Sequence, residues 1–381
     1  MSLLPWWKVK RETRRLNRQV LARLDGVLGI GRRIRYDLAW PGHLRVTQGA
    51  AAPGPLMAIF LIYQPGGIAG SVHSAIDALR ASGASLVIVS NLPLSDSDRT
   101  VLAALAWRVV ERPNLGYDFG GYREGLRQIQ AAQLDPAELW ILNDSGWFPS
   151  CPAPDGHSAP FAHQIDPDAA MSGAMFRHLK RAHQHKWIES HFLRFPRSTL
   201  VHPAFLRFFR RYPLLNLKYA VVRHGEMGLG RALGGAGLRV DSQMSNARFI
   251  NLLAGLSTLF LRKTLEYGGL VPPALITARA ALLAADDSGP AWRAAVMDHV
   301  AASLDRSEFY YQFPYAAVHL MGFPFIKKGP DPRHIVWRMQ HLTAVLAGDL
   351  PPLPPAIQAE LSAAVARDKL KADVDWRLPA G

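Results

Sequence analysis

The chain has 381 residues, and 49% of them are hydrophobic, which is enough for a buried core and excludes a disordered protein. Its formal net charge is +14, and residues 1–35 hold ten Lys and Arg residues against only Glu12 and Asp25. Cys151 is the single cysteine, so an intramolecular disulfide is excluded, and a structural role is favoured over metal binding.

Residues 1–48 form a basic N-terminal segment in which apolar residues recur at helical spacing between Leu16 and Leu28. An amphipathic helix of this kind is typical of a protein that lies on an anionic membrane surface. The alternative is that the apolar stripe packs on the rest of the protein and the arginines are solvated. No nucleic-acid recognition motif accompanies the charge, so we expect no nucleic-acid partner. The apolar run 249–261 is too short to span a bilayer.

A regular alternation of strands and helices follows the linker-like residues 49–55. Apolar runs predict strands at 56–63, 85–90, 107–110 and 139–142, and helical periodicity predicts helices at 71–81, 96–106 and 122–132. This order predicts an α/β fold with a parallel, doubly wound sheet flanked by helices. We expect one domain over residues 56–245 and a mainly helical C-terminal region, 246–381, that packs on it.

A glycine-rich stretch, Asn114 to Tyr122, follows the third predicted strand. Gly116 is suited to a positive φ, and glycines let a backbone approach a ligand closely. We therefore expect Asn114, Asp118 and the backbone amides of this stretch to hold a phosphorylated, nucleotide-linked substrate. The alternative for Asp118 is a cap on the helix that follows.

Asn143-Asp144-Ser145 ends the fourth predicted strand, at the sheet edge where open α/β folds bind ligands. It resembles the short acidic motif with which many nucleotide-sugar transferases hold a divalent cation, and hard oxygen ligands suit Mg²⁺ or Mn²⁺. The alternative is a plain Asx turn. The histidines between positions 178 and 191 match no zinc pattern, and we expect them on a solvated or anion-binding face: His178, His183, His185 and His191.

Five motifs together resemble the rhamnan synthesis protein F family, from about residue 56 to 332. They are residues 114–122, 142–145, 190–193, 225–229 and 322–327. The resemblance implies a GT-A-like, Rossmann-type glycosyltransferase of bacterial surface-polysaccharide or lipopolysaccharide assembly. It also implies a nucleotide-sugar donor, a glycan or lipid-linked acceptor, and a peripheral position on the cytoplasmic face of the inner membrane.

Carried over by position, the family motifs assign roles to residues of this chain. Asp144 would ligate the metal beside the donor diphosphate, and Glu226, with Glu189 behind it, would be the base for an inverting transfer of a sugar such as rhamnose. The alternative for Glu226 is a salt bridge to Arg223 or Arg231. The expected substrate-binding residues are Tyr63, Asn91, Asn114, Gly116, Asp118, Gly120, Tyr122, Arg123, Asn143 and Lys327. The alternative for the whole chain is a non-catalytic, membrane-docked component of a polysaccharide-assembly complex.

Overall fold

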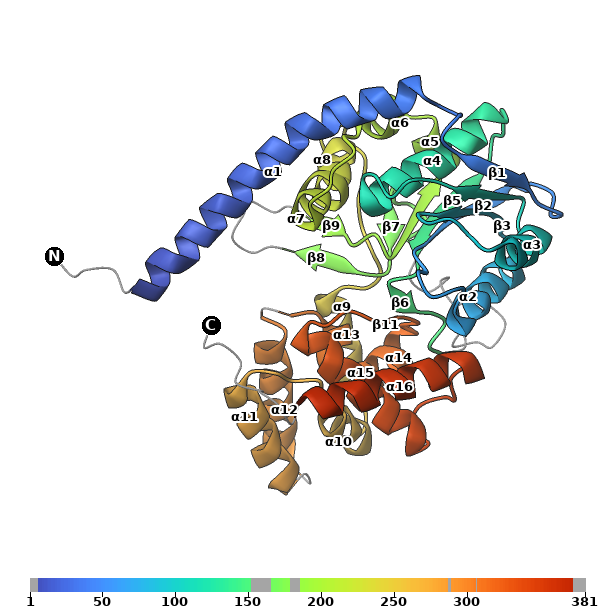
Figure 1. Ribbon diagram of the computed structural model, residues 1–381. Coiled ribbons are helices and arrows are strands. Elements are labelled where there is room, and N and C mark those ends of the chain that lie inside the picture. Colours follow the sequence, from blue (N-terminus) through green and yellow to red (C-terminus); the bar gives the residue numbers. More distant parts are fainter. Residues whose placement is uncertain (1–5, 152–165, 179–185, 287–288, 306, 373–381) are drawn as a thin grey trace.

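The computed structural model describes residues 6–151, 166–178, 186–286, 289–305 and 307–372 (Figure 1). Its centre is a seven-stranded sheet with the order β1-β4-β3-β2-β5-β10-β7. These strands are β1 (Arg45–Gln48), β2 (Leu56–Ile62), β3 (Ser85–Ser90), β4 (Arg108–Glu111), β5 (Glu138–Asn143), β7 (Ser172–Gly173) and β10 (Phe192–Pro196). The predicted α/β fold with a mostly parallel sheet and flanking helices is confirmed.

The sheet is parallel in the middle and antiparallel at both edges. β4, β3, β2 and β5 run parallel, with Ile62 opposite Ser90 and Leu61 opposite Asn143. β1 pairs with β4, and β10 pairs with β5 and β7, all antiparallel. The sheet is therefore mostly parallel, as predicted, and its antiparallel pairs lie at the two edges.

The central strands are continuous apolar runs because both faces of the sheet are covered by helices. On one face, Phe60 and its neighbours pack on α2 (Gly70–Ala81) and on the C-terminal helices. On the other face, Leu61 and its neighbours pack on α4 (Tyr117–Ala131), α6 (Pro203–Arg211) and α8 (Met227–Gly234). Alternate residues of one strand thus belong to two separate cores.

The C-terminal part is helical and shares one core with the sheet. Its helices gather below the sheet in Figure 1. They are α9 (Asn246–Ala254), α10 (Thr258–Glu266), α11 (Pro273–Ala284), α12 (Pro290–Ser303), α13 (Phe309–Gln312), α14 (Pro314–Met321), α15 (Pro332–Leu346) and α16 (Pro355–Ala372). Between α14 and α15, the short strand β11 (Ile326–Lys327) pairs with β6 (Gly146–Trp147) in a separate two-stranded sheet, which places Lys327 opposite Gly146, soon after the end of β5.

The basic N-terminal segment forms one long helix, α1 (Trp6–Leu38). Its inner face is fixed by the buried carboxylate of Asp25, which accepts hydrogen bonds from the backbone N–H groups of Asn216 and Leu217, both at 2.9 Å. These residues immediately precede α7 (Lys218–Val221). Within the described residues, no helix combines the length and the apolar character needed to cross a membrane.

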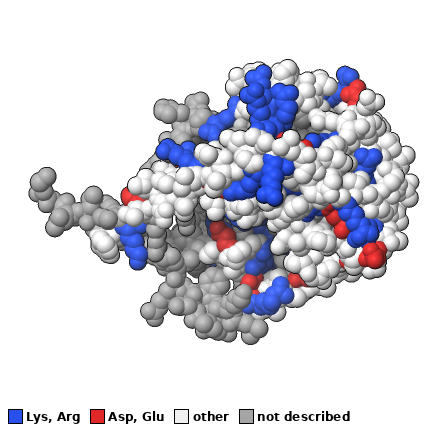
Figure 2. Space-filling view, turned by 45° about the horizontal axis from the view of Figure 1, so that its top comes forward, with Lys and Arg blue, Asp and Glu red and all other residues white. Residues whose placement is uncertain are grey.

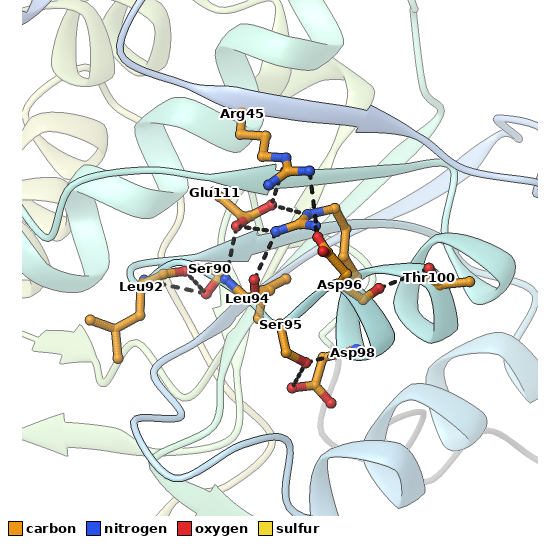
Figure 3. A network of polar contacts seen from close by, with 10 residues as sticks. Arg45, Ser90, Leu92, Leu94, Ser95, Asp96, Asp98, Thr100 and Glu111 are labelled. Carbon is orange, nitrogen blue, oxygen red and sulfur yellow. Dashed lines mark hydrogen bonds and ion pairs between the residues drawn. The ribbon is translucent and has the colours of Figure 1, made fainter.

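A buried ion pair fixes the loop after β3 and the start of α3 (Asp96–Leu105) (Figure 3). Arg99 Nε lies 2.5 Å from Glu111 Oε1, and the backbone N–H of Leu94 donates to Glu111 Oε2 at 2.8 Å. Burial alone would raise the pKa of Glu111, but the hydrogen bonds from Arg99 and Leu94 hold it below its usual value. Ser95 accepts from the backbone N–H of Asp98 and caps the helix.

The strand order creates a topological switch point between β2 and β5. From β2 the chain adds β3 and then β4 on one side, whereas β5 is added on the other side of β2. In open α/β sheets, ligands bind beyond the carboxyl ends of the strands at such a point. Here these ends lead to Tyr63 after β2 and to Asp144 after β5.

Candidate functional site

Asp144 lies at the switch point and links the ends of the two strands. Its Oδ2 atom accepts hydrogen bonds from the backbone N–H of Tyr63 at 2.8 Å and from Gln64 Nε2 at 2.6 Å. Burial raises the pKa of Asp144 above its usual value, although these bonds and the charge of Lys328 oppose the shift. The structure therefore places Asp144 at the carboxyl ends of the parallel strands, and its contact with a ligand stays a prediction.

Asp118 approaches the same point from the first turn of α4. The chain enters this helix through two residues with positive φ, Gly116 at 82° and Tyr117 at 48°. A positive φ is strained for an aromatic residue, and such strain is concentrated at functional sites. The helix begins without a side-chain cap, so the capping alternative for Asp118 is not realised.

The Asp118 carboxylate is electrostatically coupled to Asp144. Burial is the main cause that raises its pKa to about 6, and the charge of Asp144 raises it further, while Lys218 and Lys327 oppose the shift. Within the described part of the chain, Asp118 forms no hydrogen bond and no ion pair. Two carboxylates thus lie near each other, and one of them has no bonded partner among these residues.

The glycines of this stretch are explained by close packing. A Cβ added at Gly120 would lie 2.1 Å from Leu115 O, and one added at Gly121 would lie 2.3 Å from Leu61 Cδ1. The glycines therefore allow α4 to lie directly on β2. Gly116 supplies the positive φ and packs on Leu214. Gly116 and Gly120 thus have a structural role, and their contact with substrate stays a prediction.

Glu226 reaches the site from a different element, at the end of a π-helical turn (Val222–Glu226) between α7 and α8. Such turns occur frequently at functional sites. Glu226 Oε1 accepts hydrogen bonds from the backbone N–H of Ser190 at 3.0 Å and from its hydroxyl at 2.9 Å. Burial and then the charge of Glu189 raise the pKa of Glu226 to about 7. The alternative is a salt bridge from Glu226 to Arg223 or Arg231. The described residues show neither pair, and Arg231 donates to two backbone carbonyls instead.

Lys327 connects Glu189 with a buried histidine. Its Nζ atom lies 2.9 Å from Glu189 Oε2 and donates to His191 Nδ1 at 3.1 Å. His191 Nε2 lies 3.0 Å from the hydroxyl of Ser145. Burial, and then the charge of Lys327, lower the pKa of His191 well below its usual value. A neutral ring that accepts at Nδ1 carries its proton at Nε2 and donates it to Ser145.

The sequence predicts that the histidines lie on a solvated or anion-binding face. His191 is buried, so it is not solvated, and its part in binding an anion stays a prediction. His183 and His185 lie outside the described residues, as does the side chain of His178. We use the name switch-point cluster for Asp118, Asp144, Glu189, Glu226 and Lys327.

Asn143 and Tyr122 form hydrogen bonds with each other and with Ser190, next to this cluster. Asn143 Nδ2 donates to the Tyr122 hydroxyl at 2.8 Å and to Ser190 O at 3.1 Å, while the backbone N–H of Ser145 donates to Asn143 Oδ1 at 3.1 Å. The last bond is the Asx turn foreseen as the alternative. The Tyr122 side chain is fully buried, and its hydroxyl donates to Ser190 O. Both residues therefore hold Ser190 and the turn that contains Asp144, and their direct contact with substrate stays a prediction.

Three predicted substrate-binding residues lie elsewhere. Arg123 points to the other side of α4, where its Nη2 donates to Asp37 of α1 at 2.7 Å. Asn91 is buried and accepts a hydrogen bond from Arg112 at 2.5 Å. Asn114 is exposed and has no described contact with the switch-point cluster. Tyr63 remains at the site through its backbone N–H, and its side chain is exposed.

The structure also brings forward residues that the sequence patterns did not single out. Gln64 holds Asp144, while Lys218 and Lys328 lie within electrostatic reach of Asp118 and Asp144. A sequence signal existed only for Lys328, which directly follows Lys327. Ser71, Gly146 and Lys328 line a cavity of about 10 Å³ beside Asp144, which is the volume of about one water molecule. The donor site therefore cannot be this cavity.

Comparisons with known proteins agree with the motifs. The family model of Rhamnan synthesis protein F matches residues 86–252, which confirms the resemblance over that part of the chain. The chain is 29% identical to the uncharacterized protein y4gN of Sinorhizobium fredii over 263 residues, 68% of this chain and 67% of that protein.

A search of solved structures finds the mannosyltransferase PcManGT of Pyrobaculum calidifontis, in complex with GDP-Man and Mn²⁺. The match covers 93% of this chain and 97% of that one, with 14% identity and a TM-score of 0.30. This likeness carries no argument about the function of the chain.

Proposed function

We propose that this protein is a glycosyltransferase that moves a sugar from a nucleoside-diphosphate donor to a surface polysaccharide or a lipid-linked glycan. The observation that carries the proposal is the switch-point cluster: Asp144 is held at the switch point by Tyr63 and Gln64, Asp118 lies within its electrostatic reach, and Glu226 approaches from another element. The match to Rhamnan synthesis protein F supports it and makes rhamnose the first sugar to test.

Asp118 and Asp144 form the donor side. In the described part of the chain, no group of three His, Cys, Asp or Glu residues could hold a metal ion. Two carboxylates nevertheless fit Mg²⁺ or Mn²⁺, since these ions commonly take one or two carboxylates and complete their shell with substrate phosphates and water. The bound cation would neutralise the charge that develops on the departing diphosphate.

Lysines surround these carboxylates and would hold the rest of the donor charge. Lys218 and Lys327 lie within electrostatic reach of Asp118, and Lys328 within reach of Asp144. Burial lowers the pKa of Lys328 relative to its usual value, and the charges of Asp144 and Glu360 oppose that shift. A diphosphate oxygen near these ammonium groups would be stabilised more in a partly buried site than in water.

Glu226 forms the acceptor side and would act as the general base. A carboxyl group with a pKa of about 7 is divided between its two protonation states at neutral pH, which suits proton transfer. Ser190 fixes Oε1, and Oε2 forms no hydrogen bond in the described part of the chain. Glu226 takes the proton of the acceptor hydroxyl as that oxygen bonds to the anomeric carbon and the donor diphosphate leaves. A single displacement of this kind inverts the anomeric configuration.

We further propose that the protein works on the cytoplasmic side of the inner membrane, where nucleotide-linked donors are made. One observation favours the alternative, a non-catalytic component of an assembly complex: α1 leaves an apolar face exposed, as an assembly subunit would. Donor binding separates the two proposals.

Isothermal titration calorimetry with UDP, GDP and dTDP, with and without Mn²⁺, tests the donor site. We expect one nucleotide to bind with Mn²⁺ dependence, and Asp144→Asn to abolish that binding. Asp77→Asn is the matched control, because Asp77 is an exposed carboxylate on α2. If none of the nucleotides binds, the enzymatic proposal fails and the assembly role remains.

A further inference from the structure

The solvent-facing side of α1 is apolar along most of its length. Leu16 is 62% exposed, Leu24 is 55%, Val27 is 70% and Leu38 is 83% exposed. At 3.6 residues per turn, these side chains fall on one side of the helix, together with Val20 and Ile34. Soluble proteins rarely expose a continuous apolar surface of this kind unless it is an interaction site.

The C-terminal half of α1 is attached to the body of the protein through its opposite side, so the apolar side of that half is held outward. Gly29 packs on Pro213 and Leu214, and Arg32 Nη1 donates to Leu214 O at 2.7 Å. Farther along, the Tyr36 hydroxyl donates to Glu124 at 2.8 Å. These contacts fix the rotation of the helix. The exposed side is therefore a stable surface of the fold.

Cationic side chains border this apolar side. Lys10, Arg23 and Arg35 are exposed on α1, and Arg207, Arg210 and Arg211 are exposed on α6. The two helices are neighbours, since Arg33 Nη1 donates to Arg210 O at 3.4 Å. Figure 2 shows Lys and Arg side chains gathered on the face along which α1 extends, with few acidic ones between them. The surface is thus apolar and flanked by positive charge.

A groove beside α1 adds a place for an anionic group. Its volume is about 360 Å³, and Arg207, Arg211 and His224 line it together with Phe208 and Tyr212. His224 Nε2 lies 4.0 Å from an ideal Cβ at Gly26, which places the groove against the flank of α1. One guanidinium group can donate two parallel hydrogen bonds to a phosphate group. The volume of the groove is sufficient for a phosphorylated head group.

We propose that the outer side of α1 and the arginines of α6 form a docking surface for an anionic lipid bilayer. The apolar side chains enter the interface while the cations meet lipid phosphates, as in other interfacial helices. A second copy of this chain is a poorer occupant, because pairing two such surfaces brings arginines of both copies together. The inference is independent of the proposed sugar transfer.

Flotation of the full chain with vesicles tests this surface. We expect binding to vesicles of phosphatidylglycerol and phosphatidylethanolamine, and little binding to pure phosphatidylcholine. Leu24→Glu with Val27→Glu should reduce the bound fraction at least about tenfold, since charges replace inserted apolar groups. The control is Leu259→Glu with Leu346→Glu, because these side chains are 67% and 68% exposed on α10 and α15.

A second pair of variants tests the charge. Arg207→Glu with Arg211→Glu should weaken binding to anionic vesicles at least about tenfold, since each basic residue near an anionic surface adds to the affinity. Arg80→Glu with Arg248→Glu, at exposed positions elsewhere, should not. Circular dichroism and thermal unfolding check that each variant folds.

Three outcomes would overturn the proposal: no vesicle binding by the wild-type chain, equal binding by the α1 variants, or a dimer in sedimentation velocity that Val27→Glu dissociates. Nucleotide binding measured on the same variants separates this failure from failure of the proposed function.

Discussion

Phe119 and Gly225 lie in such close contact that a Cβ at position 225 would come within 2.4 Å of Phe119 Cδ2. Phe119 directly follows Asp118, and Gly225 directly precedes Glu226. The contact therefore joins α4 and the π-helical turn at the residues next to the Asp118 and Glu226 carboxylates. It fixes the spacing between the proposed donor side and the proposed acceptor side.

Replacing Gly225 tests this spacing. We expect Gly225→Ala to destabilise the fold by about 1–3 kcal/mol, because the added methyl group overlaps a buried ring in a packed core. We also expect sugar transfer to fall at least about tenfold, since a displacement of about 1 Å in a reacting group has effects of this size. Urea unfolding and a transfer assay measure the two effects.

Gly234→Ala is the control for that variant, because a Cβ at Gly234 meets no atom within 4 Å. A Gly225→Ala protein with wild-type stability and wild-type transfer would show that the contact does not set the geometry of the site.

Glu226→Gln tests the proposed base through pH. The folded-state pKa of Glu226 is about 7, above its usual value of 4.5. Stability that this group contributes below its unfolded pKa is therefore lost as the pH rises through about 7. We expect Glu226→Gln to stabilise the fold at about pH 8, by on the order of 2 kcal/mol, and to leave it nearly unchanged at about pH 4.

The same variant should lose sugar transfer, whereas the wild-type rate should rise with pH through about 7 as Glu226 ionises. Unfolding free energies at the two pH values and a pH–rate profile provide the measurements. The control is Glu266→Gln, an exposed residue of α10. If the unfolding free energies of Glu226→Gln and the wild type differ by the same amount at both pH values, the pKa of Glu226 is not raised.

Asp118→Asn tests the proposed cation site. Because the pKa of Asp118 is about 6, protons compete with a cation below this pH, and Mn²⁺ affinity in the presence of the nucleotide should fall as the pH drops through that range. The variant should bind Mn²⁺ at least about tenfold more weakly, since it loses a carboxylate ligand. Electron paramagnetic resonance of free Mn²⁺ measures the affinity.

Asp98→Asn is the matched control, since Asp98 also lies in the first turn of a helix that follows a parallel strand. Unaltered Mn²⁺ affinity in Asp118→Asn would remove this residue from the donor side.

Arg99→Met tests the ion pair that fixes α3. The substitution leaves the buried Glu111 carboxylate without its guanidinium partner, so we expect a loss of about 3 kcal/mol or more in unfolding free energy. Arg99→Met combined with Glu111→Leu removes both charges and should recover part of that loss. Chemical denaturation compares the two, and a single variant as stable as the wild type would refute the prediction.

Much of the sheet could be predicted, because each central strand is a continuous apolar run with turn residues at its end. The antiparallel edges could not, since β10 pairs with β5 across about fifty residues that carry no regular pattern. α4 begins at Tyr117 and not near 122, because the positive φ values of Gly116 and Tyr117 let the helix start earlier.

The candidate site was predictable where a residue ends a strand, as Asp144 does. Arg123 was misplaced because one residue along a helix turns the side chain by about 100°, from the sheet side of Tyr122 to the α1 side. The pairing of Lys327 with Glu189 joins segments far apart in the chain, and no local pattern carries that information. The domain boundaries at residues 56, 245 and 246 remain predictions.

The most direct test of the central claim is release of the nucleoside diphosphate from a panel of nucleotide sugars, with dTDP-rhamnose first, in the presence of Mn²⁺ and a lipid-linked glycan. We predict that the wild-type chain and Asp77→Asn turn over one donor. Asp144→Asn should lose at least about a hundredfold in rate, the size of effect found when one group that stabilises transition-state charge is removed. Turnover by Asp144→Asn at the wild-type rate would contradict this prediction.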